Sequence, residues 1–383
     1  MGPLKGIKIL EFAGIGPGPF CGMLLADLGA EVIKISRPES KGGGTVYDLN
    51  DRSKFSITRD LKKDESTDEL KKLVGQVDAI FEGFRPGVME KLGLGPDDLL
   101  NVNKKLVYGR MTGWGQEGTF SNIAGHDLNY LSITGALNAI GRKDERPPVP
   151  LNLIADYGGG GMLLAVGMLS ALMHSQKTGE GQVVDAAMID GSSMLMSLFY
   201  SFYGSGMWIN ERESNLLDGA AHFYDTYECK DGKFIAVACI EDKFYKEMID
   251  KLEIADERFL KQFDKDMWSE LKAILGEKFL SKNRDEWAII FKDSDACITP
   301  ILDLDEAPKH EHNKSSIREL GNRLYGGGTD VRIRQEYILG IGGVIAIKKL
   351  SLWPIRGIHL NEGHTAFAAV SYTHLTLPTK RIV

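Results

Sequence analysis

The sequence predicts an α/β protein with a Rossmann-like large domain and a smaller α+β domain. Strand-like and helix-like segments alternate from residue 7 onward, and the first strand runs into a glycine-rich loop, which is typical of a parallel sheet. Near residue 210 the pattern changes to a β-hairpin followed by charged helices. A chain of 383 residues is long enough to give each domain its own core.

The large domain is expected to open with a β-loop-α-β unit. Residues 7–12 alternate apolar and polar side chains, as a strand does, and residues 14–18 form a loop with prolines at 17 and 19. An amphipathic helix over 20–28 and a strand over 31–35 follow. The glycines of the loop do not have the G-x-G-x-x-G spacing, so dinucleotide binding is only weakly indicated.

The remaining elements extend this pattern. Further strands are expected over 55–58, 79–84, 105–111 and 181–189, and helices over 64–73, 88–92, 156–178 and 190–208. In the small domain, strands over 223–228 and 234–239 form a hairpin, followed by helices over 243–252, 266–280 and 284–291 and a strand over 297–302. We therefore predict a large domain over residues 1–210 and a small domain over 211–316.

Composition excludes several classes of protein. The net charge of −7 argues against nucleic-acid binding, which requires a basic face. The most apolar stretch, residues 162–173, is shorter than the roughly 20 residues that span a bilayer. A metal site is not expected, since the cysteines form no CxxC pair and His310 and His312 beside Glu311 are the one weak cluster of metal-ligand types. The four scattered cysteines are expected to be buried thiols. The N-terminus is no signal peptide, so a cytoplasmic protein is expected, with mitochondrial and peroxisomal locations left open.

Two titratable residues stand in settings suited to proton transfer. His126 lies at a predicted helix start, where the macrodipole favours the neutral imidazole. Asp156 follows an apolar stretch, which favours the protonated carboxyl, and precedes four glycines that allow a ligand to approach the backbone. An imidazole and a carboxyl that face one pocket can remove a proton from carbon and return it on the other face. Each residue could instead serve as a helix cap.

Seven segments, taken in order, resemble the family III CoA-transferases and their racemase relatives. They are GIKILEFAGIGPGPFCGMLLADLGAEVIKI from residue 6, FEGFRPGVMEKLGLGP from 81, GRMTGWGQEG from 109, AGHDLNYLSITG from 124, PLNLIADYGGGG from 150, TGEGQVVDAAM from 178, and LDGAAHFYDTYECKDGKFIAVACIE from 217. The resemblance covers about residues 3–316. It implies two interlocked chains, an active site between the large domain of one and the small domain of the other, CoA thioesters as substrates, and no metal or redox cofactor.

The resemblance also implies roles for residues at matching positions. His126 and Asp156 would be the two acid/base groups, and Glu241 would support the histidine from the other subunit. The positions implied to bind CoA or substrate are Arg37, Arg59, Asp60, Leu61, Lys62, Arg85, Gly125, Asp127, Leu128, Asn129 and Tyr130. For Glu241 and for each arginine taken singly, a solvated surface role is the alternative.

The predicted reaction is the interconversion of (2R)- and (2S)-2-methylacyl-CoA thioesters through an enolate, without a cofactor. A thioester acidifies its α-carbon because the enolate oxygen carries the negative charge, and nearby donors stabilise that oxygen. The alternative is a CoA transferase of the same fold that uses Asp156 as a nucleophile. That branch usually has an aromatic residue where His126 stands, so His126 favours the racemase.

The chain after about residue 316 departs from the family pattern. The segments NRLYGG from residue 322, RIRQE from 332 and HLNEGH from 359 resemble an internal piece of a bacterial α-glucan phosphorylase, without its pyridoxal-phosphate lysine region. Residues 371–379, SYTHLTLPT, look like a translated cloning adaptor. We therefore predict a foreign segment over 317–369 and an adaptor-like tail over 370–383. An inactive fusion product with impaired dimerisation is the third hypothesis.

Overall fold

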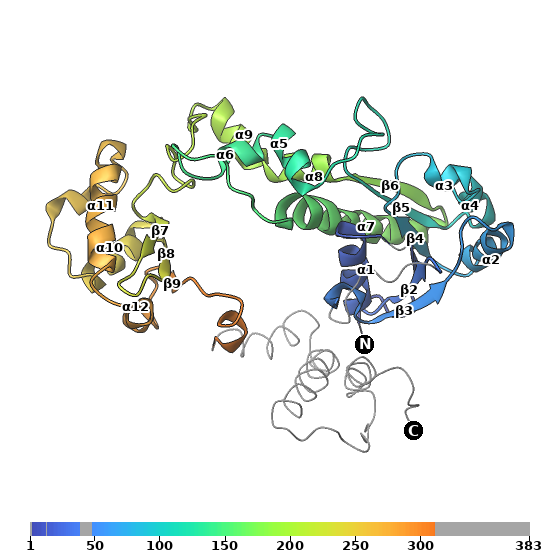
Figure 1. Ribbon diagram of the computed structural model, residues 1–383, viewed down its shortest axis with the longest axis horizontal. Helices are drawn as coiled ribbons and strands as arrows, with labels where there is room; N and C mark the ends of the chain where they lie inside the picture. Colours follow the sequence, from blue (N-terminus) through green and yellow to red (C-terminus); the bar gives the residue numbers. More distant parts are fainter. Residues whose placement is uncertain (1, 13, 39–47, 311–383) are drawn as a thin grey trace, which may run out of the picture. The chain divides into compact units, whose positions relative to one another are not determined.

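The computed structural model describes residues 2–12, 14–38 and 48–310 (Figure 1). These residues form two compact units. Unit 1 takes its described residues from 1–124, 155–191 and 308–310, and unit 2 comprises 125–154 and 192–307. The predicted foreign segment and adaptor-like tail lie outside the described residues.

Unit 1 is built on a six-stranded parallel sheet in the order β3-β2-β1-β4-β5-β6. The strands are β1 (Lys8–Phe12), β2 (Glu31–Ser36), β3 (Lys54–Thr58), β4 (Ala79–Glu82), β5 (Val107–Thr112) and β6 (Gln182–Ala187). This is the strand order of a Rossmann fold, which confirms the predicted parallel sheet. Every residue of β4 and β5 is buried, as expected for central strands covered on both faces.

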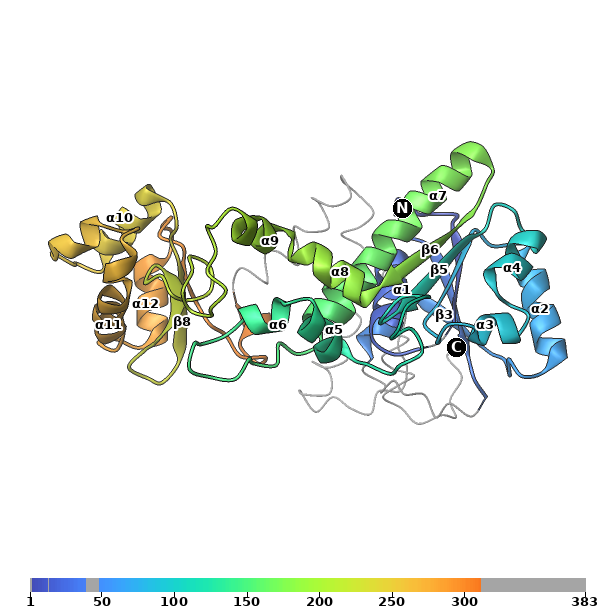
Figure 2. The ribbon, with the colours of Figure 1, turned by 90° about the horizontal axis from the view of Figure 1, so that it is seen from above.

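Helices cover both faces of this sheet (Figures 1 and 2). One face carries α1 (Pro17–Asp27) and α7 (Leu163–Thr178), and the other carries α2 (Asp64–Val74), α3 (Val88–Lys91) and α4 (Pro96–Val102). The short helix η1 (Leu49–Asp51) precedes β3. Leu10, Ile80 and Tyr108 of the sheet share a core cluster with Leu70 and Leu99 of the second face.

A buried ion pair lies between the sheet and α1, and its lysine, Lys54, also donates to the carbonyl of Pro19 in α1 (2.9 Å). The Lys54 ammonium lies 2.6 Å from Glu11 Oε2, and both side chains are buried. Gly22 of α1 lies directly above this pair, because a Cβ built there would come within 2.0 Å of Glu11 Oε2. Burial raises the pKa of the Glu11 carboxyl to about 7, and the neighbouring ammonium of Lys54 opposes this effect.

Three helix predictions for unit 1 need correction. Helix α1 begins at Pro17, three residues earlier than expected, because the first turn of a helix tolerates proline. No helix was expected over α4. The apolar helix expected over 156–178 consists of a π-helix, η2 (Leu153–Met162), followed by α7. Together, residues 153–178 form a 26-residue helix that contains an 18-residue window of mean hydropathy 1.3, which is long and apolar enough to cross a membrane by length and composition alone. However, α7 packs on β5 and β6 as a helix of the sheet.

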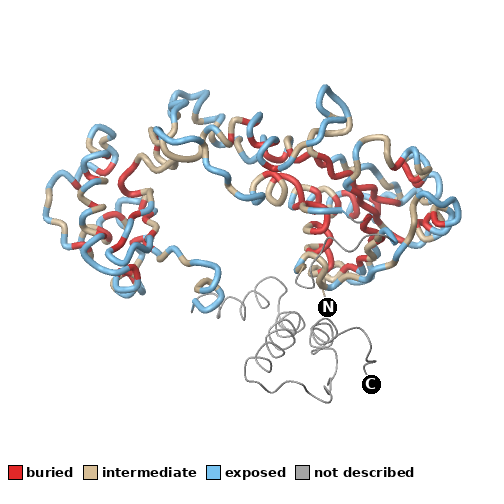
Figure 3. Tube along the Cα trace, in the orientation of Figure 1, coloured by how far each residue is buried: buried red, intermediate tan, exposed pale blue. Residues whose placement is uncertain are grey.

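Unit 2 contains a three-stranded antiparallel sheet formed by β7 (Tyr224–Glu228), β8 (Phe234–Ala238) and β9 (Ile298–Pro300). Its helices are α5 (Asp127–Ile133), α6 (Ala136–Ala139), α9 (Ser197–Gly204), α10 (Asp242–Lys251), α11 (Trp268–Phe279) and α12 (Arg284–Phe291), with short turns η3 (Glu257–Leu260) and η4 (Lys265–Met267). A further short turn, η5 (Ala307–Lys309), crosses the boundary between the units. The hairpin and helices predicted from residue 223 onward are present. Figure 3 shows how the buried residues concentrate inside each unit.

Two further predictions were wrong. The single helix expected over 190–208 is divided into α8 (Met188–Leu195), which spans the unit boundary, and α9. Cys21, Cys229 and Cys239 are buried free thiols as predicted, but Cys297 is exposed. Cys297 lies just before β9 with φ 51°, and its thiol donates to the carbonyl of Asp295 (3.4 Å) at the surface.

Candidate active site

Asp156 lies within the π-helix η2. π-helical turns are rare and frequently occur at functional sites. The Asp156 side chain is half-buried, and its carboxyl faces the loop between β1 and α1, since a Cβ built at Gly16 would lie 3.3 Å from Asp156 Oδ2. Asp156 is therefore placed at the carboxyl end of β1.

That end of β1 is the topological switch point of the sheet. Strand β1 pairs with β2 on one side and with β4 on the other, so the chain leaves β1 and β4 in opposite directions along the sheet. Doubly wound sheets bind their ligands in the crevice at this point. Asp156 therefore lies where doubly wound sheets generally bind their ligands.

Arg37 and Arg85 come from the loops on either side of the switch point. Arg37 follows β2, and its guanidinium carbon lies 5.8 Å from the ring centre of Phe84, which follows β4. Arg85 is exposed in the same loop as Phe84. The loops after β2 and β4 therefore meet across the end of β1 and bring two cationic side chains to the edge that carries Asp156.

Buried charges support this loop, and the sequence analysis missed them. The N–H of Phe84 donates to Glu82 Oε2 (2.7 Å). Arg110 donates to Glu82 Oε1 (3.1 Å) and to Glu90 Oε1 (2.8 Å). Burial raises the pKa of the Glu82 carboxyl to about 7 although these donors lower it. The sequence offered a signal for these buried charges, because Glu82 and Arg110 are charged residues inside the otherwise apolar strand segments FEGF and YGRM.

The predicted CoA-binding segment from Arg59 to Lys62 follows β3 at the same edge of the sheet. Arg59 donates to Glu69 of α2 (2.7 Å), and Asp60 accepts from the N–H of Lys62 (3.1 Å). Leu61 packs against the core. A cavity of about 300 Å³ lies beside Arg59, and it is lined by Ile33, Ile57, Leu70, Leu73, Arg59 and Glu69. A polar segment thus adjoins an apolar pocket.

His126 is the N-cap residue of α5, as predicted, but its imidazole does not cap the helix. The cap is supplied by Asn129, whose Oδ1 accepts from the backbone N–H of His126 (3.1 Å). The His126 side chain is exposed and makes no cap hydrogen bond. A helix-capping role, the alternative for His126, therefore does not account for its imidazole.

The other predicted residues of this segment shape the turn. The Tyr130 hydroxyl donates to the carbonyl of Gly125 (2.5 Å). Asp127 and Tyr130 are buried, whereas Leu128 is 38% exposed. The turn is consequently fixed from within, and it presents His126 and Leu128 outward.

Glu241 is the N-cap residue of α10, and its carbonyl accepts from the N–H groups of Phe244 (3.0 Å) and Tyr245 (2.9 Å). Its side chain is exposed. His126 and Glu241 belong to unit 2, whereas Asp156 and the arginines belong to unit 1. Within unit 1 the structure gathers Asp156, Arg37 and Arg85 at one sheet edge. The pairing of His126 with Asp156 across a substrate remains a prediction.

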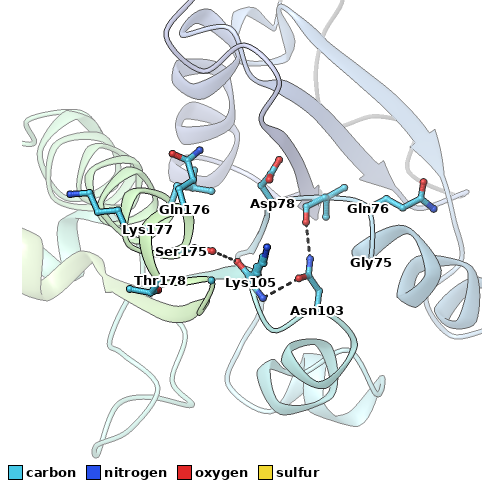
Figure 4. A pocket seen from close by; sticks show the side chains of 12 residues that line it. Gly75, Gln76, Asp78, Asn103, Lys105, Ser175, Gln176, Lys177 and Thr178 are labelled. Atoms are coloured by element: carbon cyan, nitrogen blue, oxygen red, sulfur yellow. Dashed lines mark hydrogen bonds between the residues drawn. The ribbon is translucent and has the colours of Figure 1, made fainter.

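A larger cavity, of about 650 Å³, lies at the opposite edge of the sheet (Figure 4). It is lined by residues just before β4, β5 and β6, including Asp78, Lys105 and Thr178. Its polar groups mainly fix the backbone, as when Ser175 donates to the carbonyl of Lys105 (2.6 Å). No predicted site residue lines it.

Comparison with known proteins shows the family of this chain. The family model of CoA-transferase family III matches residues 4–322. The chain belongs to CoA-transferase family III.

Two curated members of family III share 43% identity with this chain. They are the α-methylacyl-CoA racemases of Mus musculus, over 311 residues, and of Homo sapiens, over 313 residues, and each match covers 81% of both chains. A solved structure, a CAIB/BAIF family protein from Brucella suis, superposes with a TM-score of 0.70 at 27% identity, covering 82% of this chain and 88% of that one. Across 2–12, 14–38 and 48–310, no group of three or more His, Cys, Asp or Glu side chains could hold a metal ion.

Proposed function

We propose that this chain is a racemase that interconverts (2R)- and (2S)-2-methylacyl-CoA thioesters without a cofactor. The observation that carries the proposal is the His126 imidazole, which is exposed on a rigid turn and is not used to cap its helix. The Asp156 carboxyl beside the switch point supplies the second group. The two relatives at 43% identity that bear the racemase name support the same reaction.

The proposed chemistry requires one base and one acid. With one enantiomer, the neutral His126 imidazole takes the α-proton, and the electron pair of the broken C–H bond moves into the thioester carbonyl to give an enolate. The protonated Asp156 carboxyl then donates to the opposite face, and the carbonyl reforms. The other enantiomer follows the reverse route, with Asp156 as base, so no external oxidant or acceptor is consumed.

The substrate would be held chiefly through its CoA portion. Arg37 and Arg85 provide charge for phosphate groups at the switch point, and Arg59 and Lys62 add charge farther along the same edge. The apolar pocket beside Arg59, of about 300 Å³, suits a flat purine ring. Residues of the 125–130 turn, including the outward-facing Leu128, would contact the acyl part.

We further propose that two copies associate and that Glu241 of one copy supports His126 of the other. Exposed apolar side chains favour a second copy as the partner. Met162 at the end of η2 and Val166 and Met173 of α7 follow one helix face and are 50%, 60% and 59% exposed. Separately, Met194, Leu198 and Tyr203 of α8 and α9 are 48–63% exposed. Apolar side chains left exposed along one helix face are a feature of interaction sites.

Heavy water tests the proposed reaction. A purified sample is incubated in D2O with a 2-methylacyl-CoA and no acceptor acid, and deuterium at the α-carbon is followed by mass spectrometry. The racemase should wash deuterium into the α-position. Absence of exchange, together with acyl transfer to an added carboxylate, would instead support the CoA transferase, with Asp156 as nucleophile. Absence of both, with an aggregated sample on size-exclusion chromatography, would support the inactive fusion product.

A further inference from the structure

The loop residue Gly16 touches the proposed acid/base carboxyl. A Cβ built at Gly16 would lie 3.3 Å from Asp156 Oδ2 and 3.8 Å from Asp156 Cγ. The first distance is tighter than ordinary contact, so any side chain at position 16 would require the carboxyl to move by a few tenths of an ångström.

The carboxyl has little room to retreat together with its backbone. The helix η2 is pressed against α1, because a Cβ at Gly161 would meet Phe20 Cδ1 at 2.7 Å and the carbonyl oxygen of Pro17 at 2.8 Å. Tyr157, next to Asp156, stacks on Phe20 with ring centres 4.7 Å apart. A side chain at position 16 would therefore turn the Asp156 side chain rather than shift η2.

The backbone conformation of Gly16 also requires a glycine at this position. Its φ of 68° and ψ of −117° lie in a region that residues with a Cβ avoid, and this conformation starts α1 at Pro17. The conformation and the contact are separate reasons for glycine, and variants at other positions can distinguish them.

We propose that Gly16 is a positioning residue for the proposed reaction, and that its missing side chain leaves the space in which the Asp156 carboxyl is aimed at the substrate α-carbon. This inference rests on the proposed function. Misplacing a reacting group by about 1 Å can cost on the order of 100-fold in rate. An alanine methyl that displaces the carboxyl should accordingly lower kcat while leaving the CoA-binding arginines, and hence KM, nearly unchanged.

The test compares Gly16→Ala with two matched variants. Gly14→Ala changes the same loop at a position where a Cβ meets no atom within 4 Å. Gly232→Ala introduces backbone strain at a similar φ of 74°, also with no atom within 4 Å. Because the required displacement is smaller than 1 Å, we expect Gly16→Ala to lower kcat for inversion by about 10-fold with KM within about 2-fold, and both control variants to keep kcat within about 2-fold.

A second measurement does not depend on activity. In a double-mutant cycle of melting temperatures, Gly16→Ala should cost less when Asp156 is alanine, because the carboxyl atoms it meets are gone. If Gly16→Ala alone does not fold, the double variant should fold. Additive melting temperatures, failure of the double variant to fold, or a normal kcat in Gly16→Ala would overturn the inference. Coupled melting temperatures without racemisation by the wild-type chain would refute the proposed function and leave the contact standing.

Discussion

Acidification should destabilise unit 2 through one buried histidine. His222 is 0% exposed, and the rings of Phe223, Tyr245 and Phe259 surround it with centres 5.1–5.7 Å from its own. Its Nε2 lies 2.7 Å from the Tyr245 hydroxyl. Burial lowers the pKa of the imidazole from its ordinary 6.5 to about 4. The folded chain therefore keeps His222 neutral at a pH where the unfolded chain is protonated.

The sign and size of the effect follow from linkage. Because the unfolded state binds the proton more tightly, the stability contributed by neutral His222 is present above about pH 6.5 and is lost as the pH falls toward 4. A pH of 5 lies 1.5 units below the unfolded pKa of 6.5. At about 1.36 kcal/mol per unit, the free energy of unfolding falls by about 2 kcal/mol.

Urea unfolding at pH 7.5 and pH 5 measures this loss, with fluorescence of the buried Trp268 and Trp287 reporting on unit 2. Other groups also titrate, so the informative quantity is the difference from His222→Gln, which cannot titrate. The variant should lose about 2 kcal/mol less than the wild-type chain between the two pH values. Equal losses in both chains would refute the reasoning.

Three further outcomes are expected. Val166→Arg should convert the proposed dimer to monomer in light scattering coupled to size exclusion, whereas an unchanged mass would exclude α7 from the interface. Arg85→Ala should raise KM for the CoA thioester about 10-fold with little change in kcat; a change in kcat alone would remove Arg85 from CoA binding. Lys54→Met should cost about 3–5 kcal/mol in urea unfolding because it strands a buried carboxylate, and adding Glu11→Gln should recover most of that loss. If that second substitution gives no recovery, the ion pair is not the cause.

Much of the fold could be predicted because its signals are local. Alternating side chains predicted β1, and β2 and the unit 2 hairpin were predicted close to their observed positions. Parallel pairing followed from the helices between strands. The start of α1 was placed too late because prolines suggest a loop, yet the first-turn N–H groups have no helical partner to lose. The π-helix could not be predicted, since its wide turn has no local signature and the packing of Gly161 on Phe20 and Pro17 arises only in the folded unit.

The candidate site likewise has features that the sequence could predict and features that it could not. The helix start at His126 was readable from sequence, because a helix end has a local pattern. The sequence could not predict the capping role of Asn129 or the hydrogen bond from Tyr130 to Gly125, because both depend on how the turn closes. The contact between Gly16 and Asp156 joins residues 140 positions apart, and no spacing rule could have paired them.

The central claim is that the His126 imidazole and the Asp156 carboxyl exchange a proton with opposite faces of one α-carbon. The direct measurement is inversion of a single enantiomer of a 2-methylacyl-CoA in D2O, followed by chiral chromatography with mass detection. The wild-type chain should give the inverted enantiomer carrying one solvent deuterium, and His126→Ala and Asp156→Ala should each reduce inversion by at least about 100-fold while remaining folded. Near-normal inversion by either variant, or inversion without label, would contradict the account.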